Sequence, residues 1–167
     1  MKIKPIPTKE ILHQHFNYVD GKLVWKNTYS KAKANKPVGW VEKNGYVATN
    51  LNGIRYRVHR LVFMYFHGYC PDYIDHIDGN KQNNSIENLR KADVFQNACN
   101  RSAIKTNKLK IKGVCKDGGR YKANIKKFGK SYHLGYFDTA EEAEQAYLQA
   151  AKKLHGEFAW NNLTKSI

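Results

Sequence analysis

A chain of 167 residues, in which 29 Lys and Arg face 14 Asp and Glu, carries a formal net charge of +15. This excess creates a positive field, so the expected partner is a polyanion, and double-stranded DNA first. No segment approaches the ~20 apolar residues of a membrane-spanning helix, and the polar start of the sequence has no apolar signal core. We therefore expect no membrane partner and a cytoplasmic location. The length suits one ordinary domain or two small ones.

The first part of the sequence predicts short strands joined by tight turns, and then a helix. Asx-Gly pairs separate the strand candidates, and such pairs tolerate the positive φ of hairpin turns. Apolar residues at helical spacing predict a helix over residues 59–67 that ends at Gly68. The strand candidates are Lys22–Trp25, residues 46–49 and residues 55–58.

A strand, a polar loop, a second strand and a helix are predicted next. Asp93 and Gln96 stand where an N-cap residue and its third-position acceptor would begin that helix. Residues 102–110 are polar and basic without periodicity, which indicates a tether or a segment that follows the minor groove. The strands are expected over residues 73–77 and 88–91, the loop over residues 78–85, and the helix to about Arg101.

The last third of the sequence predicts a three-stranded sheet covered by one helix. The middle strand alternates apolar with basic side chains. A capping box at Thr139 and Glu142 begins a helix that ends at Gly156. Basic residues lie on the strands, so the exposed face of the sheet is the predicted nucleic-acid surface. The strands are expected over residues 112–115, Arg120–Lys127 and Lys130–Phe137.

These patterns predict an α+β chain of two small domains, residues 1–104 and residues 105–167. The first would hold a β-rich extension followed by the strand, loop, strand and helix. The second would hold the basic linker and the sheet packed on one helix. Neither domain would have a large core.

Side chains between residues 74 and 97 suit phosphodiester hydrolysis. That reaction needs a base for water, a cation for the phosphate charge and a group that fixes the tautomer of the base. Asp75 and His76 are adjacent on a predicted strand, so their side chains diverge, and one could hold a metal while the other faces water. Asn97 could return to the metal. Asn88 could accept a hydrogen bond from one imidazole nitrogen of His76.

At these residues the chain resembles the HNH homing endonucleases of the ββα-metal, or His-Me finger, class. The resemblance covers residues 16–100. It implies one magnesium-like ion bound by Asp75 and Asn97, His76 as general base, Asn88 as its orienter, and products with 5′-phosphate and 3′-hydroxyl ends. The matching motifs are Val58-His59-Arg60-Leu61, Asp75-His76-Ile77-Asp78-Gly79-Asn80-Lys81, Asn83-Asn84, Asn88-Leu89-Arg90 and Asn97.

Many members of that class have histidine where this chain has Asn97, and a subgroup of homing enzymes uses asparagine. Two oxygen ligands suit magnesium, or manganese as the alternative, better than zinc. The three cysteines, Cys70, Cys99 and Cys115, lack the paired spacing of a structural zinc site. We therefore expect no zinc.

The last third resembles the Apetala-2/ethylene-response-factor DNA-binding domain over residues 110–162. That family reads the major groove with its sheet. His133 stands where it commonly has tryptophan, and Cys115 and Asp117 replace usual arginines, so the plant target sequence is not implied. The matching motifs are Lys112-Gly113-Val114, Tyr121-Lys122-Ala123-Asn124-Ile125, His133-Leu134-Gly135-Tyr136-Phe137, Thr139-Ala140-Glu141-Glu142-Ala143 and Ala146-Tyr147. The predicted DNA-binding residues are Lys112, Arg120, Lys122, Asn124, Lys126, Lys130 and His133.

Together with these patterns, the two resemblances imply a site-directed, homing-type DNA endonuclease, encoded by a phage or an intron in a bacterial host cell. The first alternative is a non-cleaving DNA-binding regulator that uses the HNH fold as a scaffold, and the second is an RNA-binding protein. A monomer, which we expect, would nick one strand, whereas a dimer could cut both. His59 could touch a phosphate or pack its own helix, and it is left outside the catalytic set.

Overall fold

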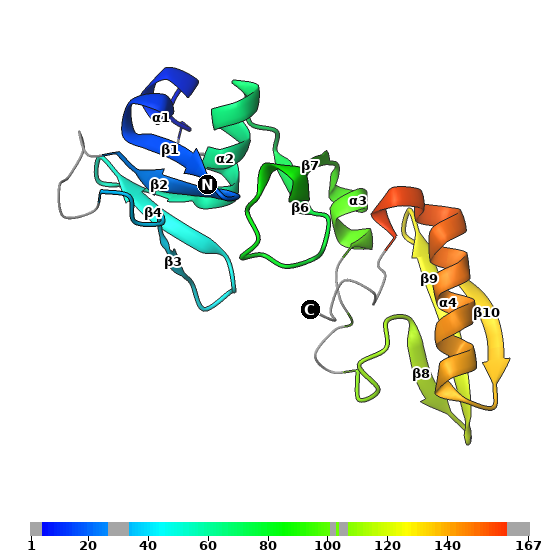
Figure 1. Ribbon diagram of the computed structural model, residues 1–167. Helices are drawn as coiled ribbons and strands as arrows, with labels where there is room; N and C mark the ends of the chain where they lie inside the picture. Colours follow the sequence, from blue (N-terminus) through cyan, green and yellow to red (C-terminus); the bar gives the residue numbers. More distant parts are fainter. Residues whose placement is uncertain (1–4, 27–33, 101–102, 104–106, 160–167) are drawn as a thin grey trace. The chain divides into compact units, whose positions relative to one another are not determined.

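The computed structural model describes residues 5–26, 34–100, 103 and 107–159. Contacts within the chain divide it into two compact units, Met1–Ala92 and Asp93–Ile167. Helices and small antiparallel sheets occur in both (Figure 1), which agrees with the α+β expectation. The sequence predicts a domain boundary at residue 104, whereas the contacts divide the chain after residue 92. The predicted domains therefore stay a prediction. Residues 101–102 and 104–106, in and beside the predicted linker, lie outside the described residues.

A short helix and a hairpin open the first unit. Helix α1 (Lys9–His15) is capped by Thr8, whose side chain accepts from the backbone N–H of Ile11. It leads directly into β1 (Phe16–Val19), which pairs antiparallel with β2 (Lys22–Trp25). Strand β2 has the predicted bounds, whereas the short, polar α1 was not predicted.

A three-stranded sheet and a longer helix follow. The sheet has the order β3-β4-β5, from β3 (Trp40–Val41), β4 (Val47–Leu51) and β5 (Ile54–Arg57). Helix α2 (Val58–His67) confirms the predicted helix and ends at Gly68, whose φ of 73° is the left-handed conformation of a C-cap glycine.

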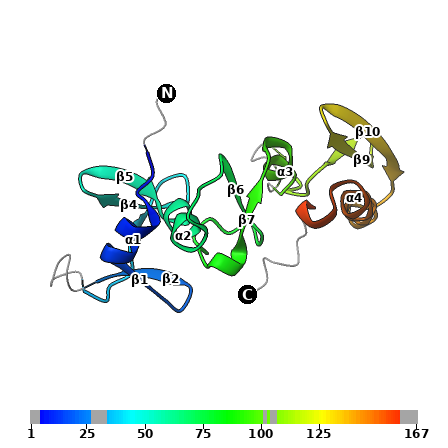
Figure 2. The same cartoon turned by 90° about the horizontal axis from the view of Figure 1, so that it is seen from above.

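Strands β6 (Tyr73–His76) and β7 (Leu89–Ala92) form the antiparallel pair predicted from the sequence, with a 3₁₀ turn (Ile86–Asn88) just before β7. A continuous apolar core joins this pair to the other elements of the unit. The core residues come from α1, β1, β2, α2, β4, β6, β7 and their connections (Figure 2). They are Leu12, Phe16, Leu23, Trp25, Val38, Leu51, Val58, Leu61, Val62, Phe63, Ile74 and Leu89.

The second unit begins with α3 (Val94–Cys99), whose capping box joins Asp93 to Gln96 as predicted. A sheet of order β10-β9-β8 follows, from β8 (Val114–Asp117), β9 (Arg120–Lys127) and β10 (Lys130–Phe137). Helix α4 (Ala140–His155) has the predicted capping box and covers one face of this sheet, before a final 3₁₀ turn (Gly156–Phe158) (Figure 1). No helix in the described part of the chain is long and apolar enough to cross a membrane.

The core of the second unit is small and rests on one close approach. Its buried residues are few and mostly small, with Tyr147 of α4 the largest of them. Gly113 has a φ of +74°, and a Cβ built on it would meet the Tyr147 ring at 2.3 Å and the backbone oxygen of Asn124 at 2.5 Å. The same segment is held to β9 by the bond from Asn124 N to Gly113 O. The core residues are Val114, Ala123, Ile125, Ala143, Tyr147 and Ala151.

Gly113→Ala is therefore expected to lower the free energy of unfolding of the second unit by about 2–4 kcal/mol, because it adds an overpacking cost to the strain of a positive φ. Gly119→Ala is the matched control, since Gly119 also has a positive φ, +88°, but no atom within 4 Å of its Cβ position. That variant should lose only about 1–2 kcal/mol. Chemical denaturation followed by circular dichroism measures both. Equal losses would contradict the role of the contact with Tyr147.

Candidate active site

The pairing of β6 with β7 fixes the two residues at the centre of the candidate site. In the register, Asp75 lies opposite Arg90 and His76 lies opposite Leu89. Asp75 and His76 are each only 5% exposed. Burial of a charged or polar side chain is unfavourable unless it is paired, so both side chains need partners inside the protein.

His76 obtains one partner from the polar loop that follows it. Its Nε2 lies 3.0 Å from Oδ1 of Asn84, a residue that is itself buried. The amide of Asn84 is oriented by a second bond, because its Nδ2 donates to the backbone oxygen of Gln82 at 3.3 Å. Burial lowers the pKa of the His76 imidazole, and the bond to Asn84 opposes that shift.

Two aromatic rings pack beside the imidazole of His76. The centroid of the His59 ring lies 5.1 Å away in a T-shaped arrangement, and that of Tyr46 lies 6.0 Å away. His59 is 4% exposed, and its Nδ1 has no hydrogen-bond partner among the described residues. Burial lowers the pKa of His59 well below its ordinary value, so this ring is neutral at neutral pH. Two neighbouring rings thus pack against His76, and one of them, His59, is uncharged at neutral pH.

Asp75 is held by a buried cation. Arg90 donates from Nε and Nη2 to the same carboxylate oxygen, Oδ2, at 2.9 and 2.8 Å. The side chain of Arg90 is 14% exposed, so this ion pair is shielded from water. Two bonds from one guanidinium to one oxygen fix the rotation of the carboxylate as well as its charge.

The loop from β6 to β7 is organised by Asp78 and Asn88. The side chain of Asn88 accepts from the backbone N–H of Asp78 at 3.0 Å, and it donates to Oδ1 of Asp78 and to the backbone oxygen of Asn83. The other oxygen of Asp78 accepts from Nδ2 of Asn83 at 2.7 Å. Gly79, with a φ of +70°, makes the turn that this network requires.

These contacts differ from the expected pairing of His76 with Asn88. The residue that the structure places against Nε2 is Asn84, four positions earlier in the chain. The described bonds of the Asn88 amide instead close the loop onto itself. The loop contains several asparagines, and the sequence does not show which of them contacts His76 and which closes the loop.

Asn97, the second predicted metal ligand, lies on α3 and therefore in the second unit. Its side chain is partly exposed, and its backbone N–H donates to Asp93 O at 3.0 Å. Among the described residues, no group of three or more His, Cys, Asp and Glu side chains could hold a metal. The joint action of Asp75 and Asn97 stays a prediction from the sequence.

Two of the predicted DNA-binding residues of the second unit are engaged within the protein. Lys112 donates from Nζ to the backbone oxygen of Cys99. Arg120 forms an ion pair with Asp138, with 3.0 Å between Nε and Oδ1, and also donates to the backbone oxygen of Tyr136. Neither contact was foreseen from the sequence.

The other predicted DNA-binding residues lie on neighbouring strands of one sheet. Asn124 is directly opposite His133 in the register, with 3.2 Å between Oδ1 and Nδ1. Lys122 lies over the ring of Tyr136, with Nζ 5.7 Å from its centroid. Lys126 and Lys130 are exposed. The buried Ala123 and Ile125 alternate with these polar residues, as predicted.

Comparison with known proteins assigns the central segment. Residues 56–98 match the family model of an HNH endonuclease. An uncharacterized HNH endonuclease, L560, of Acanthamoeba polyphaga mimivirus is 35% identical over 126 residues, which are 74% of this chain but only 65% of that protein. Protein 3.8 of Escherichia phage T7 is 34% identical over 89 residues, which are 52% of this chain and 73% of that protein.

No solved structure matches the chain. The matched segment of 56–98 contains α2, both strands of the candidate site and α3. It includes the buried Asp75 and His76, the loop asparagines Asn84 and Asn88, and Asn97. Residues 56–98 therefore form an HNH endonuclease domain, as the family match and the similarity to an HNH endonuclease indicate, and the chain spans less than two thirds of that relative's length.

Proposed function

We propose that this protein is a site-directed, homing-type DNA endonuclease that hydrolyses phosphodiester bonds with a divalent metal ion, leaving 5′-phosphate and 3′-hydroxyl ends. One observation carries the proposal: a buried His76 bound to Asn84 stands beside a buried Asp75 bound to Arg90. A general base and a candidate metal ligand are thus adjacent and individually oriented. Phosphodiester hydrolysis requires both groups.

The general base is His76. Asn84 presents an oxygen to Nε2, and an oxygen only accepts, so the proton of the neutral ring resides on Nε2. The lone pair is then on Nδ1, which is the nitrogen that takes the proton from the attacking water. Because burial lowers the pKa of His76, the ring is unprotonated at neutral pH, as a base must be.

The metal ion is magnesium, with manganese as a substitute, and the chain's own ligands are Asp75 and Asn97. The residues fit such an ion, because carboxylate and amide oxygens are the hard donors that it prefers. When bound, the ion stabilises the charge that develops on the phosphate and the leaving oxygen. Arg90 holds the Asp75 carboxylate in one rotation, which limits the reorganisation needed for ligation. No zinc is required.

Asn84 and Asn88 divide the supporting work in this proposal. Asn84 orients the base, the role that the sequence assigned to Asn88. Asn88 shapes the loop that carries Asn84, because its amide bonds both Asp78 and Asn83. Asn88 therefore acts on catalysis through the position of other residues.

The second unit binds the target DNA and so determines where the enzyme cuts. This part of the proposal rests on the resemblance to the Apetala-2 domain and on the charge of the sheet face opposite α4. The contacts that we propose to duplex DNA are Lys122, Lys126, Asn124 and His133, which share that face of the sheet. They also include Lys130, which pairs with Lys127 at the end of the hairpin and lies on the other side by strand alternation. Lys112 and Arg120 would add to them only by leaving their partners, Cys99 and Asp138.

We also propose the origin, location, oligomeric state and domain boundaries of the enzyme. The relatives from a giant virus and from a phage support a phage- or intron-encoded enzyme that acts in the cytoplasm of a bacterial host. One site per chain cuts one strand, so a monomer nicks the duplex and a dimer could cut both strands. The domains proposed are residues 1–104 for the nuclease and 105–167 for the address.

His76→Ala should lower the rate of plasmid nicking by about 10³-fold, because general-base catalysis contributes that order of magnitude. The assay is relaxation of supercoiled plasmid that contains the target, with Mg²⁺ and, separately, with EDTA, which should abolish nicking. The control is His67→Ala, an exposed histidine of α2. Equal nicking by wild type and His76→Ala would show that His76 is not the general base. If the wild-type protein binds the duplex but never nicks it, the non-cleaving DNA-binding regulator is favoured instead.

Asn84→Ala and Asn88→Ala should fail in different ways. Loss of Asn84 releases the imidazole, so kcat should fall by roughly tenfold or more. It also leaves His76 without this buried bond, so the free energy of unfolding should fall by about 1 kcal/mol. Loss of Asn88 leaves three buried bonds of the loop unmade, so the free energy of unfolding should fall by about 2–3 kcal/mol. Steady-state kinetics and urea denaturation of both variants make the comparison. A stable Asn88→Ala enzyme with the larger loss of kcat would restore the original assignment.

Lys126→Ala should weaken duplex binding at every salt concentration and lower the slope of log K against log salt by about 1, the value for one phosphate contact. Lys152→Ala is the matched control, since Lys152 is exposed on α4, on the side of the sheet away from the proposed contacts. Fluorescence anisotropy across a salt series measures the slopes. The sheet is not the DNA surface if both variants behave alike.

A further inference from the structure

Two cations lie against one aromatic ring beside the candidate active site. The guanidinium of Arg57 is 4.3 Å from the centroid of the Tyr46 ring, and Nζ of Lys81 is 4.6 Å from it. Lys81 belongs to the loop between β6 and β7, whereas Arg57 ends β5. Nζ of Lys81 also donates to the backbone oxygen of Asn44, next to Tyr46, at 3.0 Å. The three side chains are thus joined across two separate parts of the first unit.

A short chain of rings connects this cluster to the base. The centroid of Tyr46 lies 5.3 Å from that of His59, and His59 in turn packs against His76 at 5.1 Å. Tyr46 also approaches His76 directly, at 6.0 Å. The two cations therefore border the position where the base meets its substrate.

Neither cation has a direct ion-pair partner among the described residues. Arg57 and Lys81 are both exposed. Glu42 is bound by Arg55, and Arg57 acts on the same carboxylate only at longer range. A cation over an aromatic ring is held in place while its charge stays available to a second partner. Cations that are held in place without a direct ion-pair partner suit an anion of the substrate.

We propose that Tyr46, Arg57 and Lys81 form a binding subsite for a backbone phosphate of the duplex next to the bond that is cut. This inference rests on the proposed nuclease function. Arg57 and Lys81 lie within the HNH match of residues 56–98, whereas Tyr46 precedes it. The sheet of β3, β4 and β5 then belongs to the substrate-binding surface. Tyr46 is a positioning residue, and Arg57 and Lys81 make the contacts.

The test measures binding of a short duplex by full-length His76→Ala protein, which prevents cleavage. Arg57→Ala and Lys81→Ala, each added to that background, should lower the salt slope of log K by about 1, as expected for the loss of one phosphate contact. Tyr46→Leu should weaken binding several-fold, whereas Tyr46→Phe keeps the ring and should bind as the parent does. Circular dichroism melting checks that each variant is folded.

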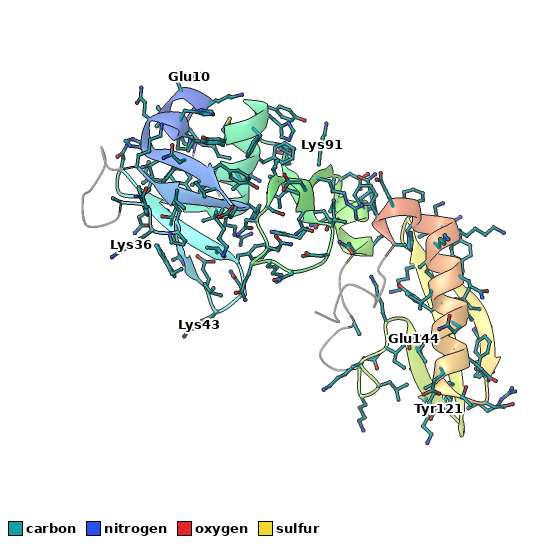
Figure 3. All side chains as sticks on the ribbon, viewed as in Figure 1. Glu10, Lys36, Lys43, Lys91, Tyr121 and Glu144 are labelled. Carbon is teal, nitrogen blue, oxygen red and sulfur yellow. The ribbon has the colours of Figure 1, made fainter. Side chains whose placement is uncertain are left out.

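The matched control is Lys43→Ala. Lys43 is exposed at the tip of the turn between β3 and β4 and points away from the sheet (Figure 3). Its substitution therefore removes the same charge without changing the contacts of the Tyr46 ring. Its slope should be unchanged. Equal slopes for Lys43→Ala, Arg57→Ala and Lys81→Ala would overturn the subsite while the nuclease proposal stands. If the His76→Ala parent binds no duplex at all, both proposals fall.

Discussion

Burial of a carboxylate and an imidazole side by side, at the end of a four-residue strand, is the constraint on which the first unit depends. Such groups are tolerated in a protein interior only when each has a fixed partner. The register of β6 with β7 brings Arg90 to Asp75, and the polar loop brings Asn84 to His76. The apolar core below, from α1 to β7, provides the rigid support that these bonds need. Stability and chemistry are thus served by the same few contacts.

The elements with strong local signals could be predicted from the sequence. Strands β9 and β10 have the expected bounds, and the capping boxes at Asp93 and Thr139 begin their helices as their spacing indicates. Helix α1 gave no such signal, because seven mostly polar residues contain too few turns to show a period. Its single buried residue, Leu12, becomes meaningful only once the core around it is known.

The residues of the candidate site were proposed from the sequence by type, whereas their partners in the fold were not. Adjacent Asp and His with asparagines at fixed distances indicate the chemistry, yet Asn84 and Asn88 both lie in one loop and differ only in where the backbone turns send their amides. Tyr46 and His59 were missed as neighbours of His76 because tertiary packing brings them together, Tyr46 from the residue before β4 and His59 from α2. A hydrophobic period shows which face of an element is buried, but not which buried side chains meet.

The bonds described for the loop close over short stretches of chain. Asp75 is only 15 positions from Arg90, and Asp78 is 10 from Asn88. Closing such short loops costs little conformational entropy, so the polar framework can assemble locally and early in folding. A segment whose polar residues are paired with one another can also keep its structure when it is placed in another chain. Recombination that transfers this one segment would transfer most of the site with it. The recipient chain would then need to provide only an apolar core and a DNA-binding unit.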